Sequence, residues 1–153
     1  MPNDIVLPAR GTAFPALDLV DADGHVAPLS ELIGGRRAVV HFMRSPSCPV
    51  CLGHGAVLQR MRSAGEIPDV PIVFVAPGGA DAAAEAQARL AGRGIVVRAS
   101  DDAHPALGLG RFLALQHSGT FVLDADGAVL SAVSAAIPTA SFSRAATIDA
   151  LRD

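Results

Sequence analysis

Two cysteines separated by two residues, Cys48 and Cys51, are the only thiols of the chain. They follow an apolar run, Ala38–Met43, that is typical of a buried strand, and a helical pattern begins at Pro49. Because proline suits the first helical position, Cys48 is expected at the N-cap and Cys51 at the third helical position. The unpaired N–H groups and the helix dipole favour negative charge at the N-cap, so we expect Cys48 to have a lowered pKa and to be the nucleophile. Cys51 can reach back and close a disulfide, which predicts thiol redox chemistry.

Two polar residues precede the cysteines and are candidates for the same site. Arg44 could hold a cation near the thiolate or bind an anionic oxygen, and the alternative is a solvated arginine at the strand end. Ser45, three residues before Cys48, could hydrogen-bond the sulfur or a bound peroxide, and the alternative is an ordinary turn serine. The sequence leaves both alternatives open.

Two histidines raise a metal site as a second hypothesis. Cys48, Cys51 and His54 form a C-x2-C-x2-H pattern, and His41 lies on the preceding strand, so these four residues could bind zinc or copper tetrahedrally. His54 lies on an apolar helix face, which favours a packed histidine over a role in proton transfer. His41 lies within the buried run, which favours a core histidine whose hydrogen bonds are satisfied.

The composition limits the remaining chemistry. The 153 residues are 50% hydrophobic and 18% charged with a net charge of −3, which excludes disorder and gives no sign of a nucleic-acid binder. No apolar run is long enough for a membrane span and residues 1–10 contain no signal sequence, so we expect a cytoplasmic protein. The chain has no lysine or tyrosine, which excludes Schiff-base and P-loop lysines, and the cysteine chemistry requires no cofactor.

The rest of the chain alternates strand and helix patterns, without a linker, so we expect one domain over residues 1–153. Strands are expected at Leu17–Val20, His25–Ala27, Ala38–Met43, Ile72–Ala76, Ile95–Arg98, Thr120–Leu123 and Ala128–Val133. Helices are expected at Pro28–Ile33, Pro49–Ala64, Asp81–Ala91 with Asp81 as N-cap and Gly92 as its stop, Pro105–Leu115 and Ser143–Leu151. Buried strands joined by helices predict a central parallel pair, and the last two strands add an antiparallel hairpin.

With these residues in view, the sequence resembles the thioredoxin-like superfamily, in particular the peroxiredoxin-like redoxins of the alkyl hydroperoxide reductase and thiol-specific antioxidant family. The resemblance extends from Gly11 to Val133. It is carried by the stretches Phe14–Leu19 with Asp23-Gly24 and Leu29–Leu32, Ala38–Cys51, Ile72–Ala76, and Gly119–Asp124 with Asp126-Gly127. It implies an α/β, thioredoxin-like fold with a central mixed β-sheet flanked by helices and an N-terminal β-hairpin extension.

The redoxin motif Pro-x-x-x-Thr/Ser-x-x-Cys can be laid on this sequence. Ser45 then matches the hydroxyl position and Cys48 the peroxidatic cysteine, while His41 stands in place of the proline. The family's second arginine is replaced by Gln116-His117-Ser118, and Arg44 or Arg111 are the candidates to substitute for it. Gly119-Thr120 stand where thioredoxins carry a cis-proline, which favours the peroxiredoxin side of the superfamily.

These observations predict a cysteine-dependent antioxidant oxidoreductase. The Cys48 thiolate would attack a peroxide or a disulfide, Cys51 would resolve the product to a 48–51 disulfide, and an external thiol reductant such as a thioredoxin system would recycle it. Peroxide and disulfide substrates both remain open, as does a homodimer, which redoxins often form. The alternatives are the zinc or copper binding module and a redox sensor without turnover.

Overall fold

The fold is known from a computed structural model that describes residues 7–90, 94–109, 111–112, 115–135 and 140–152. The strands are β1 (Asp18–Val20), β2 (Val26–Pro28), β3 (Ala38–Phe42), β4 (Ile72–Pro77), β5 (Val96–Ser100), β6 (Arg111–Phe112), β7 (Leu115–Gln116), β8 (Ser118–Leu123) and β9 (Val129–Ala135). The helices are α1 (Leu29–Ile33), α2 (Pro49–Ser63), α3 (Ala80–Arg89), α4 (Ala103–Ala106) and α5 (Arg144–Leu151).

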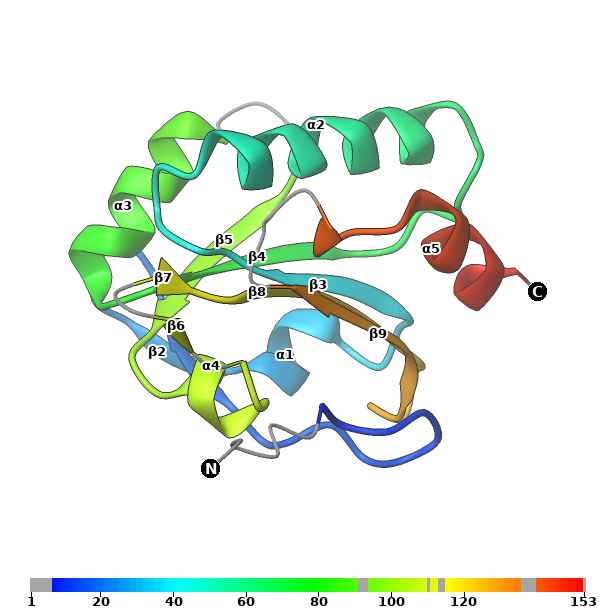
Figure 1. Cartoon of the computed structure of the whole chain (residues 1–153), viewed down its shortest axis with the longest axis horizontal. Coiled ribbons are helices and arrows are strands. Elements are labelled where there is room, and N and C mark those ends of the chain that lie inside the picture. The colour runs from blue at the N-terminus through cyan, green and yellow to red at the C-terminus, as the bar shows by residue number, and fades with distance from the viewer. Residues whose placement is uncertain (1–6, 91–93, 110, 113–114, 136–139, 153) are drawn as a thin grey trace.

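A mixed sheet of seven strands, in the order β2-β1-β5-β4-β3-β8-β9, forms the centre of the molecule (Figure 1). Strands β3, β4 and β5 are parallel, and β8 and β9 extend the sheet in antiparallel fashion beside β3. The hairpin of β1 and β2 joins the opposite side through an antiparallel pairing of β1 with β5. The expected α/β, thioredoxin-like fold with a mixed sheet, flanking helices and an N-terminal hairpin is therefore confirmed.

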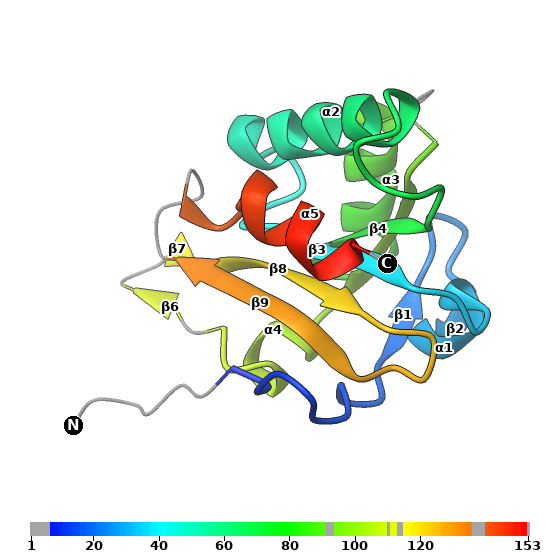
Figure 2. The same cartoon turned by 90° about the vertical axis from the view of Figure 1, so that its right-hand side faces the viewer.

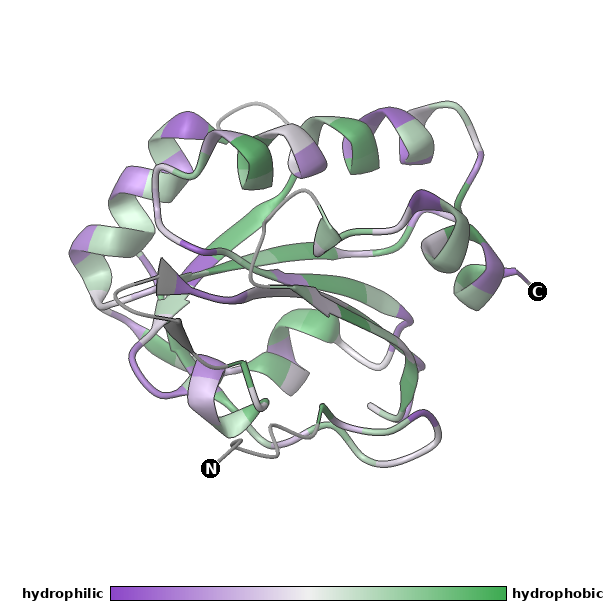
Figure 3. Cartoon of the chain, in the orientation of Figure 1, coloured by the Kyte–Doolittle hydropathy of each residue, from purple (hydrophilic) through white to green (hydrophobic). Residues whose placement is uncertain are grey.

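The helices cover the sheet in two layers, with α2, α3 and α5 on one face and α1 and α4 on the other (Figures 1 and 2). All residues of β3 are buried, as expected for a strand that is packed on both faces. Its side chains alternate, so Val39 packs into the core beneath α2, and Val40 and Phe42 pack into the second core. His41 consequently faces α2. Figure 3 shows the hydrophobic strands between helices whose outer sides are hydrophilic.

The expected helix over Pro105–Leu115 is wrong. Helix α4 covers only Ala103–Ala106, and the two-stranded ribbon of β6 and β7 follows it. The physical reason lies at Gly108, whose φ of +76° is incompatible with a continuing α-helix. Because glycine has a low helix propensity, Gly108 ends the helix even though the leucines around it follow a helical pattern.

The N-terminus of α3 also differs from the expectation. The helix begins at Ala80 with Gly79 as its N-cap, so Asp81 lies inside the first turn. Its negative carboxylate there still interacts favourably with the positive end of the helix dipole. Glu85 and Arg89, four residues apart on this helix, form an ion pair at 3.4 Å. The expected stop at Gly92 lies outside the described residues. In the described part of the chain, none of the helices combines the length and the apolar character that a membrane crossing requires.

Candidate functional site

The two cysteines lie at the N-terminus of α2, where the chain leaves the end of β3. Cys48 is the N-cap and Pro49 is the first helical residue, so the placement expected from the sequence is confirmed. The backbone N–H of Cys51 donates a hydrogen bond to Cys48 Sγ at 3.3 Å. A negative charge on Cys48 would therefore meet a donor of the first helical turn, which is the geometry that activates a thiol at a helix N-terminus.

Both sulfurs are free thiols, and both are buried, with 1% of Cys48 and none of Cys51 exposed. Burial raises the pKa of the Cys51 thiol well above its usual range, and its hydrogen bond with Cys48 raises it further. The backbone N–H and the charge of Arg44 act in the opposite direction and lower this pKa, but they do not offset the effect of burial. Cys51 is therefore held in its protonated form beside Cys48.

Arg44 lies near the cysteines, and its charge acts on Cys51. Its side chain is half-buried, and its Nε is buried without a hydrogen-bond partner among the described residues. Ser45 belongs to the turn before the helix, and its backbone carbonyl accepts a hydrogen bond from the Cys48 N–H at 3.3 Å. This contact holds Cys48 through main-chain atoms, so the role expected for the Ser45 hydroxyl stays a prediction.

His41 lies fully buried on β3, and a chain of hydrogen bonds determines its tautomer. The Thr120 hydroxyl donates its only proton to the Ser141 carbonyl at 2.7 Å, so its oxygen must accept from His41 Nδ1 at 2.8 Å. The other ring nitrogen, Nε2, then carries a lone pair, and it has no hydrogen-bond partner in the described part of the chain. His41 is a core histidine, as expected, but the expectation that all its hydrogen bonds are satisfied is wrong.

The protonation state of His41 follows from its burial. Burial lowers the pKa of His41 to about 3, and the charges of His54 and His104 lower it further. The imidazole is therefore neutral at physiological pH.

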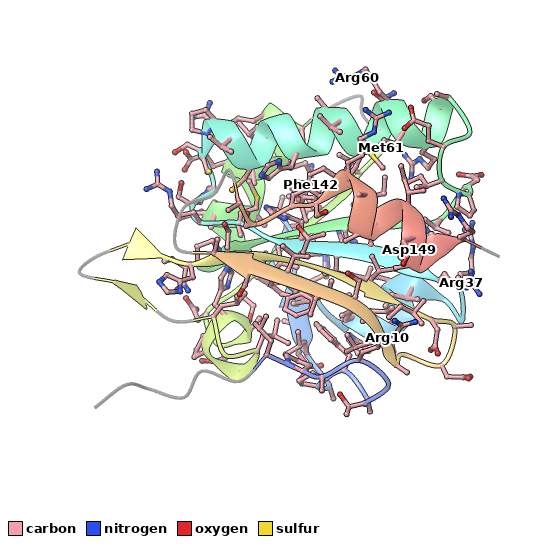
Figure 4. All side chains as sticks on the ribbon, turned by 45° about the vertical axis from the view of Figure 1, so that its right-hand side comes forward. Arg10, Arg37, Arg60, Met61, Phe142 and Asp149 are labelled. Atoms are coloured by element: carbon pink, nitrogen blue, oxygen red, sulfur yellow. The ribbon has the colours of Figure 1, made fainter. Side chains whose placement is uncertain are left out.

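His54 is the second buried histidine of this layer and lies on α2, one turn after Cys51. Its ring contacts the His41 ring, with centroids 5.4 Å apart at 75°, and the Phe142 ring, with centroids 5.1 Å apart at 41°. Figure 4 shows Phe142 in the layer between α2 and the sheet. Only 8% of His54 is exposed, so the expectation of a packed histidine is confirmed.

The hypothesis of a metal site formed by the cysteines and these histidines is not supported by the geometry. In the described residues, only Asp21, Asp23 and His25 place three potential ligand atoms within 4.8 Å of one another, and they lie on a surface turn. The cysteines and histidines beneath α2 do not converge in this way. His41 contacts Thr120 through Nδ1 and the His54 ring packs between two other rings, and their ring nitrogens do not gather with the two sulfurs as a tetrahedral site requires.

Two residues around the site were not found by sequence reasoning. Thr120 faces His41 directly across the pair β3–β8, a position that depends on strand register. His104 of α4 donates from Nε2 to the Met43 carbonyl at 2.8 Å and so holds the chain where β3 ends and the cysteine loop begins. Strand alternation could have placed Thr120 on the inner face, but nothing in the sequence pairs His104 with Met43.

The segment Gln116-His117-Ser118, which the redoxin resemblance aligns with that family's second arginine, leads into the strand that pairs with the end of β3. Gly119 pairs with Phe42 at the end of β3, next to the cysteine loop. Gln116 donates to the Leu109 carbonyl at 3.0 Å, and the Ser118 hydroxyl is buried without a partner among the described residues. The side chain of Arg111, one candidate to replace that arginine, lies outside the described part of the structure.

Several solved structures share the fold of this chain. No protein-family model matches the sequence, and no curated protein matches it significantly. Among solved structures, the peroxidoxin BcpB from Mycobacterium tuberculosis aligns with a TM-score of 0.68 at 22% identity, over 95% of this chain and 99% of that chain. Reduced Prx3 from Vibrio vulnificus in complex with H2O2 aligns with a TM-score of 0.74 at 21% identity, over 95% of this chain and 100% of that chain.

A third match is a thioredoxin domain that aligns with a smaller part of the chain. The thioredoxin domain of the thiol-disulfide oxidoreductase BVU-2223 from Bacteroides vulgatus aligns with a TM-score of 0.59 at 16% identity, over 81% of this chain and 87% of that chain. The chain thus has the fold of the peroxiredoxins and, over a smaller part, that of a thioredoxin domain. At these identities the comparisons establish the fold, while the chemistry must be argued from the site.

Proposed function

We propose that the protein is a cysteine-dependent antioxidant oxidoreductase that reduces peroxides. The observation that carries this proposal is the pair of free thiols at the N-terminus of α2, where the Cys51 N–H donates to Cys48 Sγ. The fold shared with the peroxiredoxins supports it, because a solved structure of that fold binds H2O2. Cys48 would be the nucleophile and Cys51 the resolving cysteine.

The reaction begins with attack of the Cys48 thiolate on one oxygen of the peroxide. An S–O bond forms as the O–O bond breaks, and the leaving oxygen takes a proton to give water or an alcohol. The peroxide is reduced, and Cys48 is oxidised to a sulfenic acid. The Cys51 sulfur then attacks the Cys48 sulfur, which releases water and forms the 48–51 disulfide. An external dithiol, such as a thioredoxin system, reduces this disulfide and restores both thiols.

The other groups of the site would support the first step. Arg44 supplies a positive charge near the sulfurs, and the Ser45 hydroxyl would hydrogen-bond the thiolate or the peroxide. A reducing compartment such as the cytoplasm would return Cys48 and Cys51 to the thiol state after each turnover. A homodimer is compatible with this reaction, because both cysteines belong to one helix.

A second candidate function is disulfide reduction. The spacing of Cys48 and Cys51 within one helical turn favours it, because that spacing lets one thiolate attack a disulfide and the other displace the product. The similarity to the thioredoxin domain of a thiol-disulfide oxidoreductase supports the same candidate. The two functions share the same sulfurs and differ in the electrophile.

Reaction of the reduced protein with H2O2 and, separately, with oxidised glutathione tests these proposals. We expect wild-type protein to lose two hydrogens with H2O2, C51S to gain one oxygen at Cys48, and C48S to remain unreacted. A glutathione adduct that C51S retains would instead favour disulfide reduction. If Cys48 stays a free thiol under an excess of both oxidants, the proposal is wrong.

Two further measurements address the alternatives. Sustained NADPH consumption with thioredoxin and its reductase would exclude a redox sensor without turnover, whereas a single burst would support one. Metal analysis of protein purified without chelator would support a binding module only if it finds stoichiometric metal that the C48S variant lacks.

A further inference from the structure

In the proposed function, Cys51 must lose its proton before it can form the disulfide with Cys48. Cys51 attacks as a thiolate, yet its thiol is fully buried and its pKa is raised by that burial. Bulk water cannot reach the Cys51 sulfur to take its proton. The step therefore needs a proton acceptor inside the layer between α2 and the sheet.

His54 is placed to be that acceptor. It follows Cys51 by three residues on the same helix, and both side chains lie on the buried face of α2. Residues at this spacing are neighbours on a helix surface, with Cβ atoms roughly 5–6 Å apart. The exposed 8% of His54 also gives the ring a route for exchanging a proton with solvent, which Cys51 lacks.

His41 provides the partner that a protonated His54 would need. Its Nδ1 is committed to Thr120, and its Nε2 lone pair is buried without a donor among the described residues. Leaving a buried acceptor unpaired is costly, so such an atom calls for an explanation. The His41 and His54 rings lie edge to face with centroids 5.4 Å apart, so the negative potential of this unpaired nitrogen can stabilise a positive charge on His54.

We propose that His54 accepts the proton that Cys51 loses when the 48–51 disulfide forms, and that His41 acts as a positioning residue whose Nε2 stabilises the imidazolium. This inference rests on the proposed function for its setting. The Cys51 S–H bond breaks and its proton moves to His54, while the sulfur's electron pair forms the S–S bond with Cys48. Hydroxide leaves the Cys48 sulfenic acid and takes the proton back from His54, so the net products are the disulfide and water.

The charges around His41 keep its ring neutral. Burial opposes a positive charge on His41, and the charges of His54 and His104 oppose it further, so His41 stays neutral beside a charged His54 ring. On the other side of His54, Cys48 and Arg44 are the described groups whose charges act on Cys51. A thiolate on Cys51 and an imidazolium on His54 form together as an ion pair, so each offsets part of the burial cost of the other.

Single-turnover oxidation of H54Q tests the proposal, with R60Q on the exposed side of α2 as the control. We expect H54Q to form the Cys48 sulfenic acid at the wild-type rate but to form the disulfide about 100-fold more slowly at pH 7. Its rate should rise tenfold per pH unit, because hydroxide must then remove the proton, whereas the wild-type rate should depend less on pH. Resolution in H54Q at the same rate and with the same pH profile as R60Q would overturn the proposal.

Oxidation by diamide separates this inference from the proposed function. Diamide adds to a thiol without peroxide chemistry, and the second cysteine then displaces the hydrazine to form the disulfide. If wild-type protein ignores H2O2 but forms the disulfide with diamide, the peroxidase proposal fails while the role of His54 is still measured. A slow displacement step in H54Q supports that role, and an unchanged one overturns it.

Thr120 offers a matched pair of variants that does not alter either histidine. T120V removes the oxygen that accepts from His41 Nδ1 but keeps the shape of the side chain, whereas T120S keeps the oxygen. We expect T120V to resolve about tenfold more slowly, because the His41 tautomer is no longer held, and T120S to resolve at nearly the wild-type rate. Equal resolution rates in the two variants, with both folded by circular dichroism, would overturn the role of His41.

Discussion

At the scale of single residues, the site separates two thiols that the sequence makes look alike. Cys48 caps the N-terminus of the helix and accepts a backbone N–H, whereas Cys51 lies within the first turn and is buried completely. These surroundings suit the proposed reaction, in which Cys48 at the N-cap is the nucleophile and the protonated Cys51 is the resolving cysteine. The two buried histidines extend the same layer away from the sulfurs.

The low pKa of His41 makes folding stability depend on pH. The pKa of His41 is about 3 in the folded protein against 6.5 for a free side chain, so the unfolded chain binds more protons between these values. Stability contributed by neutral His41 is thus complete above pH 6.5 and is lost as the pH falls toward 3. We expect this histidine to add up to about 1.4 kcal/mol per pH unit to the acid destabilisation of the wild type.

Urea unfolding of wild type and H41L at pH 7 and pH 4.5 measures this contribution. H41L should show a smaller loss of unfolding free energy between the two pH values than the wild type. The variant R60Q, which changes an exposed residue of α2, serves as the control and should keep the wild-type dependence. A slope in H41L as steep as in the wild type would contradict the assignment of buried, neutral His41.

At the scale of elements, α2 carries the two cysteines at its N-terminus and packs tightly in its middle. Its two glycines differ in surroundings, since a Cβ on Gly53 would meet nothing within 4 Å. A Cβ on Gly55 would lie 3.0 Å from Leu90, 3.2 Å from Ile95 and 3.3 Å from Phe74. Gly55 therefore lets α2 approach the sheet and α3 closely, which keeps the helix start at the end of β3.

Alanine at these two positions should have opposite effects on stability. We expect G53A to stabilise the protein by about 0.5–1 kcal/mol, because alanine favours a helix interior over glycine. G55A should destabilise it by about 1 kcal/mol net, because overpacking against three neighbours outweighs the gain in helix propensity. Chemical denaturation of both variants checks this, and a stabilising G55A would show that the neighbours move aside without cost.

At the scale of the whole molecule, the site depends on contacts between segments far apart in the chain. The hydrogen bond of His104 with Met43 connects residues separated by 61 positions and joins α4 to the start of the cysteine loop. Thr120 reaches His41 across 79 positions. The sheet order, with β3 between β4 and β8, is what brings these groups to the same strand.

Removing the contact from His104 should loosen the cysteine loop. In H104L the Met43 carbonyl loses a buried donor, so we expect a destabilisation of about 1–3 kcal/mol. Alkylation of Cys48 by iodoacetamide should become faster, because the sulfur is almost fully buried in the wild type. An alkylation rate equal to that of the wild type would show that α4 does not hold the loop.

The sequence was sufficient to predict the placement of the cysteines and most of the sheet. Pro49 marks the helix start, and the apolar runs mark β3 and β4, because these signals are local and act within a few residues. The helix expected over 105–115 failed because Gly108 takes a backbone conformation that competes with a weak local pattern.

The tertiary structure alone decided which polar groups meet. The tautomer of His41 depends on Thr120 and Ser141, and its unpaired Nε2 depends on the packing of α2 over β3. The metal site that the spacing of cysteines and histidines suggested is not formed, because the ligand atoms of these described residues do not come close enough to one another. Residue spacing is a local signal, and it is enough to place both sulfurs at a helix N-terminus. Hydrogen bonds and burial depend on segments remote in sequence, so only the packed sheet determines which groups surround the sulfurs.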